Sequence, residues 1–160
     1  MNTSLLNCCI AVQLLCATVA LARIGETEAQ IETRYGRPIK IFPAAASTLK
    51  LPGSTIKVYK TGDVGVVVVF FNGFSGSERY LKASRGKLTL SEIEAILAAN
   101  GGQKEWSETE RKPSMTSWSL NDLIARFDKT DGHLVISSKK FLDAMHAADK
   151  ADANARLRNF

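Results

Sequence analysis

The sequence predicts an α+β domain in which an antiparallel β-meander and a second pair of strands pack with about three helices. Consecutive strand patterns follow one another across short turns between Thr55 and Ala83. Helical periodicity occurs before, between and after these runs of strands, rather than alternating with each strand as in a doubly wound sheet. The length of 160 residues, with 45% hydrophobic and 23% charged residues, fits one folded domain.

Residues 1–22 have the pattern of a secretory signal peptide. No charged side chain occurs from Met1 to Ala22, and an apolar run from Cys8 ends in Ala20-Leu21-Ala22. This run is shorter than the roughly 20 apolar residues of a membrane-spanning helix, so we expect cleavage after Ala22. An uncleaved anchor stays open as an alternative, because no Lys or Arg precedes the run.

Residues 23–160 are then expected to form a single α+β domain, secreted or periplasmic, with 147–160 as a charged, Ala-rich helical tail. All cysteines lie in the expected leader, at Cys8, Cys9 and Cys16. The processed chain would therefore have no disulfide, no Cys nucleophile and no Cys metal ligand. Its stability must come from the hydrophobic core.

Three helices are predicted from periodicity and end signals. The first follows Gly25 and is stopped by Gly36, with Ile31 and Tyr35 on one face. The second spans about 90–100, where Thr89-Leu90-Ser91-Glu92 forms a capping box. The third starts at Ser138. Because the first two helices each precede strands, their order hints at a diverged duplication.

Five strands are predicted. An alternating strand at Thr55–Lys60 and a strand at Ser77–Ala83 flank Val64–Phe71, which is apolar at both parities and is expected at the centre of the sheet. The second pair comprises Ser117–Phe127 and His133–Ser138. The segment 39–54 is expected to be an extended connection or a short edge strand.

The central strand needs cover on both faces. We expect the second half of the chain to pack across it, with apolar material from Trp106, Trp118, Leu120, Ile124 and Phe127. The alternative is an obligate oligomer built on an uncovered sheet face.

Basic residues cluster on both sides of the central strand, within a net charge of +5. If the neighbouring strands pair with it, Lys57, Tyr59, Tyr80 and Lys82 share one sheet face. This predicts an anion-binding face, for an acidic polymer, lipid headgroup or acidic protein, whose alternative is an ordinary solvated edge. The residues assigned to this binding face are Lys57, Tyr59, Lys60, Arg79, Tyr80, Lys82, Arg85 and Lys87.

The sequence contains only weak matches to known catalytic and metal-binding motifs. Gly73-Phe74-Ser75-Gly76-Ser77 resembles a glycine-flanked nucleophile, but a strand rather than a helix follows it, so a turn is the favoured interpretation. Asp128, Asp131 and His133 cluster without metal-ligand spacing, and Asp131-Gly132 fits a turn. The sequence also lacks glycine-rich phosphate loops. We predict no catalytic residue, metal or cofactor.

The start of the expected mature chain resembles a known family. Ile24-Gly25-Glu26-Thr27, followed by Ile31 and Tyr35-Gly36-Arg37-Pro38, is similar to the first helix of small bacterial envelope proteins of the SmpA/OmlA type. It is also similar to short secreted bacterial proteins of unassigned activity. The resemblance implies a fold like that of β-lactamase inhibitor proteins and a scaffold or protein-binding role. It carries over no functional residue.

The sequence thus favours an exported, non-enzymatic binding or structural domain that recognises an anionic partner through a basic face. The expected partner is an envelope protein or an acidic polymer, with no specific nucleic acid and no stable transmembrane span after processing. The alternative is a small extracytoplasmic hydrolase using Ser75 or His133.

Overall fold

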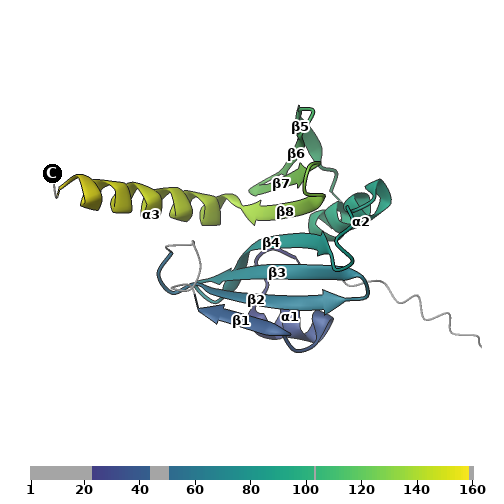
Figure 1. Ribbon diagram of the computed structural model, residues 1–160, viewed down its shortest axis with the longest axis horizontal. Helices are drawn as coiled ribbons and strands as arrows, with labels where there is room; N and C mark the ends of the chain where they lie inside the picture. The colour runs from purple at the N-terminus through teal and green to yellow at the C-terminus, as the bar shows by residue number, and fades with distance from the viewer. Residues whose placement is uncertain (1–22, 44–50, 103, 159–160) are drawn as a thin grey trace, which may run out of the picture.

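The computed structural model describes residues 23–43, 51–102 and 104–158, so the expected signal peptide lies outside the described residues. Within these ranges the fold is α+β, with three helices and one eight-stranded antiparallel sheet (Figure 1). In chain order the elements are α1 (Glu28–Tyr35), β1 (Lys40–Pro43), β2 (Thr55–Thr61), β3 (Val64–Phe71), β4 (Phe74–Lys82), α2 (Leu90–Gly101), β5 (Ser107–Arg111), β6 (Met115–Leu120), β7 (Leu123–Asp128), β8 (His133–Ser138) and α3 (Lys139–Leu157).

The sheet consists of two meanders joined through their last strands, in the order β1-β2-β3-β4-β8-β7-β6-β5. Each meander follows one helix, α1 or α2. Both helices begin with a complete capping box, Thr27 with Gln30 and Thr89 with Glu92. The same unit of one helix and four strands therefore occurs twice, in line with the duplication suggested by the sequence.

One face of the sheet is buried under α1 and α2. Side chains from both meanders and both helices form the main hydrophobic cluster, including the fully buried Ile31, Tyr59, Val66, Tyr80 and Leu134. Figure 1 shows α1 behind the strands of the first meander. We call this side of the sheet the helical face.

The opposite side, which we call the open face, is covered only in part. The first half of α3 packs there, and Phe141 joins Ile56 and Val69 in a second, smaller hydrophobic cluster. Beyond these contacts α3 extends away from the body, and Leu157 near its end is 68% exposed (Figure 1). Among the described residues, no helix is both long and apolar enough to cross a membrane.

The three-stranded meander around Val64–Phe71 is confirmed, but the second strand pair is wrong in detail. The predicted strand Ser117–Phe127 is a hairpin of β6 and β7 that turns at Asn121, whose φ of 51° lies in the left-handed region. With β5, which the sequence did not predict, it completes a second meander. The extended segment after residue 39 contains the edge strand β1.

The cover of the central strand agrees with the prediction in part. The strands of the second half of the chain extend the sheet sideways, because β8 pairs with the outer edge of β4. The cover comes from α1 and α2 on the helical face and from α3 on the open face, and of these α2 and α3 belong to the second half. Trp106, Trp118 and Phe127 pack against the main cluster, while Ile124 lies on the open face beside a pocket.

Candidate functional site

The open face carries a row of side chains that runs across all eight strands. Register partners in a sheet point to the same side, so a chain of paired residues defines such a row. We call it the central row; from β1 to β5 it comprises Lys40, Val58, Val67, Arg79, Val135, Arg126, Ser117 and Glu110.

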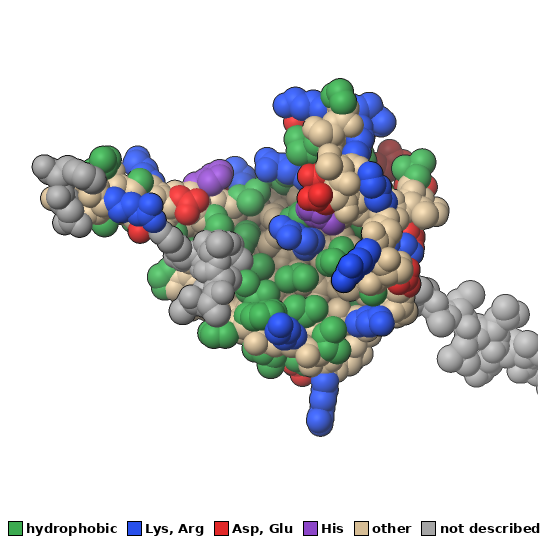
Figure 2. All heavy atoms as spheres, in the orientation of Figure 1, with side chains coloured by type: hydrophobic (Ala, Val, Ile, Leu, Met, Phe, Trp, Pro, Cys, Tyr) green, Lys and Arg blue, Asp and Glu red, His purple; other side chains and the backbone are tan. Residues whose placement is uncertain are grey.

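Cations and valines therefore share the centre of this face. Arg79 and Arg126 flank Val135 on strands two apart, which places their Cα atoms about 10 Å from each other. Both arginines are exposed. Figure 2 views the molecule from this side and shows hydrophobic side chains with Lys and Arg side chains between and around them.

Along the part of the chain that the structure describes, neither arginine has a carboxylate within ion-pair distance. The acid in the central row, Glu110 on the edge strand, pairs with Lys112 at 2.6 Å. At the other edge, the Lys40 ammonium lies 4.5 Å from the centre of the Phe42 ring. The row therefore presents net positive charge to an incoming molecule.

A pocket of about 250 Å³ opens beside Arg126 on the same face. It is lined by Met115, Ile124, Arg126, Asp128, His133, Val135, Ser137 and Leu142. The walls come from the second meander and from α3.

The polar groups of the pocket differ in how they are used. Asp128 Oδ1 accepts hydrogen bonds from the backbone N–H groups of Thr130 and Asp131, at 2.7 and 3.0 Å, and these bonds lower the pKa of Asp128. The hydroxyl of Ser137 lies 2.8 Å from that of Ser77. Asp128 and Ser137 are thus engaged within the fold, whereas Arg126 is available to a ligand.

The residues assigned to a binding face from the sequence are divided between the two sides of the sheet. Lys57, Tyr59, Tyr80 and Lys82 do share one face, but it is the helical face. Tyr59 and Tyr80 are 0% exposed and belong to the core, so neither ring is part of a surface.

The two lysines of the helical face are paired with carboxylates. Lys57 Nζ lies 2.8 Å from Glu28 and 3.0 Å from Glu32 of α1, and the hydrogen bond that it donates to Glu28 is the main cause of its raised pKa. Lys82 Nζ lies 2.6 Å from Glu92 of α2. These lysines attach the helices to the sheet.

Of the other assigned residues, Lys60 and Arg79 lie on the open face, Lys60 in register with Gly65. Arg85 and Lys87 lie in the exposed connection between β4 and α2, where Lys87 Nζ donates to the backbone oxygen of Lys129 at 2.6 Å. Sequence reasoning missed Lys40 and Arg126. The alternation of apolar Ala125 and Phe127 with Arg126 and Asp128 was a local signal that Arg126 faces away from the core. Its position beside Arg79 depends on the pairing of β4 with β8.

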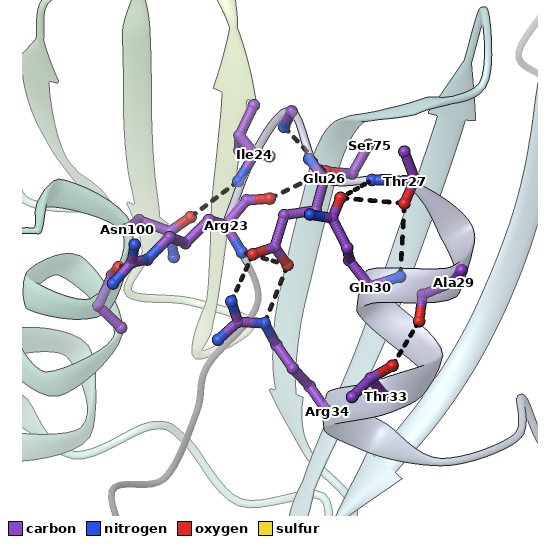
Figure 3. Close-up of polar contacts among 12 residues, drawn as sticks. Arg23, Ile24, Glu26, Thr27, Ala29, Gln30, Thr33, Arg34, Ser75 and Asn100 are labelled. Carbon is purple, nitrogen blue, oxygen red and sulfur yellow. Dashed lines mark hydrogen bonds and ion pairs between the residues drawn. The ribbon is translucent and has the colours of Figure 1, made fainter.

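Ser75 holds the N-terminal segment, residues 23–27, against the sheet (Figure 3). Its hydroxyl accepts from the N–H groups of Gly25 and Glu26 at 3.0 and 3.2 Å and donates to the backbone oxygen of Arg23 at 3.1 Å. On the other side of the segment, the N–H of Ile24 donates to Asn100 Oδ1 of α2 at 3.3 Å. Ser75 is 2% exposed and acts as a structural anchor.

A buried carboxyl group lies close to this anchor. Glu78 is 0% exposed, and one of its oxygens accepts from the Tyr80 hydroxyl. The other, Oε1, has no hydrogen-bond partner among the described residues. Asn100 Nδ2 in turn donates to the Tyr80 hydroxyl at 3.2 Å. Burial raises the pKa of Glu78 to about 7, against the opposing effect of the Tyr80 hydrogen bond.

The two residues named for a hydrolase do not form one site. Ser75 faces the N-terminal segment on the helical side, whereas His133 lines the pocket on the open face. A nucleophile and its base must lie within hydrogen-bond reach of each other. The described parts of the chain also bring no three His, Cys, Asp or Glu side chains together as a metal site.

Comparison with known proteins assigns no family to the chain. No family model and no curated protein match it. One similar solved structure is a cysteine-rich secretory protein from Staphylococcus aureus, with 11% identity, a TM-score of 0.47, and coverage of 74% of this chain and 46% of that one. Another is an extracellular protein containing an SCP domain from Bacillus anthracis, with 12% identity, a TM-score of 0.47, and coverage of 75% and 45%. The chain spans less than half the length of either neighbour.

Proposed function

We propose that this protein is an exported, non-enzymatic binding domain that recognises an acidic protein through the open face of its sheet. The observation that carries the proposal is the central row, where Arg79 and Arg126 flank Val135 and form no ion pair with any described residue. The leader-like residues 1–22 support export.

The composition of the open face favours a protein surface over a dense polyanion. Arginines set among apolar side chains are typical of protein interfaces, where they supply hydrogen bonds and contact area together. A polyanion reader would need closely spaced cations, whereas here valines separate them. Lys40 and Arg79 lie three strands apart, about 14 Å. A partner with acidic and apolar groups on one surface fits this spacing.

Heparin binding tests the electrostatic part of the proposal, because heparin supplies negative charge without apolar groups. We would measure its affinity for the purified protein at several NaCl concentrations. The variant Arg79→Gln/Arg126→Gln is compared with Lys104→Gln/Lys150→Gln, which removes the same charge from exposed positions outside the central row. We expect the arginine variant to lower the slope of log affinity against log salt by about 2, and the control to change it far less.

Equal effects of the two double variants would refute the assignment of the open face, because net charge alone would then explain retention. Absence of salt-dependent heparin binding by the wild type even at low salt would also count against it, because widely spaced cations still attract a polyanion when screening is weak. Unchanged thermal unfolding of both variants shows that the comparison concerns binding and not folding.

A further inference from the structure

The pocket beside Arg126 differs from the rest of the open face because a cation borders apolar walls. Its lining includes Arg126 and four apolar side chains, those of Met115, Ile124, Val135 and Leu142. Its volume of about 250 Å³ lies below the roughly 300–1,000 Å³ of pockets that hold whole cofactors or drug-sized ligands. One small group of a ligand is therefore the matching occupant.

The lining of the pocket holds one cation, Arg126, and one acid, Asp128, and they differ in how far they are already engaged. Asp128 is held by the turn that follows β7, and no ion pair joins it to Arg126 within the described chain. Arg126 is exposed, and a guanidinium matches the two oxygens of a carboxylate in a bidentate pair. The other cation lining the face nearby, Arg79, lies across Val135 and adds positive potential from the same side.

We infer that this pocket binds an apolar group that carries a carboxylate, with the carboxylate at Arg126 and the apolar part against Met115, Ile124 and Leu142. The inference rests on the proposed function, since the pocket belongs to the same face, and it names the chemistry that is read there. The terminal residue of a protein chain and a fatty acid share this chemistry.

Four small probes distinguish the contribution of the carboxylate to binding from that of the apolar group. N-acetyl-leucine has both an apolar group and a carboxylate, N-acetyl-leucinamide lacks the charge, acetate lacks the apolar group, and octanoate represents a fatty acid. Each is titrated into the ¹⁵N-labelled protein while the backbone amide shifts of β7 and β8 are followed. The proteins compared are the wild type, Arg126→Gln, and Lys104→Gln as the charge-matched control.

We expect N-acetyl-leucine and octanoate to shift amides around Arg126 and Val135, and each to bind about tenfold more weakly to Arg126→Gln. The control should bind like the wild type. The amide and acetate should bind at least about tenfold more weakly than N-acetyl-leucine. Tighter binding of N-acetyl-leucine than of octanoate identifies a peptide end as the source, and the reverse identifies a fatty acid.

The inference is overturned if the amide binds as tightly as the acid, if acetate binds as tightly as N-acetyl-leucine, or if no probe shifts the pocket amides. These results are independent of the heparin measurement, because each probe carries at most one charge and occupies only the pocket. Heparin binding that depends on both arginines, together with failure of every probe, would retain the open face and reject the pocket.

Discussion

The substitution Glu78→Gln should make the fold progressively more stable relative to the wild type as the pH rises from mild acid to neutral. In the folded wild type the buried carboxyl has a pKa of about 7 and so keeps its proton up to about that pH. In the unfolded chain its pKa has the ordinary value of 4.5, and the proton is released near that pH. The free energy of unfolding therefore falls as pH rises between these values and levels off above about 7. At about 1.4 kcal/mol for each tenfold change in proton affinity, the total decline is about 3 kcal/mol.

Glutamine preserves the shape of Glu78 and an acceptor for the Tyr80 hydroxyl, but it cannot ionise. Any cost of burying its amide is the same at every pH. A difference in unfolding free energy between variant and wild type that changes with pH therefore reports the ionisation of Glu78. The neighbouring charges are Glu26, which raises the pKa of Glu78, and Arg34, which lowers it, and both are present in the two proteins.

Urea unfolding between pH 4.5 and 8.5 measures the effect. We expect the difference in unfolding free energy, variant minus wild type, to rise by about 3 kcal/mol between pH 4.5 and about 7 and to stay constant from there to pH 8.5. Glu94→Gln, which removes an exposed carboxylate of α2, is the matched control and should give a difference that varies little with pH. A constant difference for Glu78→Gln would refute the reasoning, because the carboxyl would then ionise alike in both states.

Three further substitutions test the packing and the caps. Ser75→Ala removes the anchor of the N-terminal segment and should cost about 1–3 kcal/mol, with faster amide hydrogen exchange in that segment; unchanged exchange would contradict the anchoring role. Gly76→Ala places a Cβ 2.7 Å from the Phe141 ring, so we expect a lower Tm and a loss of about 1–3 kcal/mol of unfolding free energy. An unchanged Tm would show that α3 can shift away from the sheet without loss of stability. Thr89→Ala removes the N-cap of α2 and should cost about 1 kcal/mol in thermal unfolding, whereas Thr109→Ala on the exposed edge strand should cost far less.

The elements with strong local signals were predictable. The capping box at Thr89 and the helical spacing of Ile93, Ile96 and Leu97 indicated α2, and the side chains concerned are buried as expected. The hairpin at Asn72-Gly73 was also predictable, because both residues adopt the positive φ that this turn requires. By contrast, the turn at Asn121 was missed, since Asn-Asp between two apolar runs is a weaker turn signal than Asn-Gly.

The residues assigned to a binding face from the sequence show what strand alternation can and cannot predict. Alternation correctly placed Lys57 and Tyr59 on one side of β2, but it did not show which side the helices cover. Because α1 supplies Glu28 beside Lys57, that side is buried and the opposite side stays open. Exposure therefore depends on where the helices pack, which strand periodicity does not record.

The sequence by itself determined the α+β class, most helix and strand positions and the parity of side chains along each strand, because these depend on near neighbours in the chain. Only the tertiary structure decided that β4 pairs with β8, which places Arg79 and Arg126 on either side of Val135. This pairing joins segments that are far apart in the sequence, and it forms because the two meanders bury their apolar side chains in one shared core. Patterns of neighbouring residues along one strand do not specify which distant strand it pairs with.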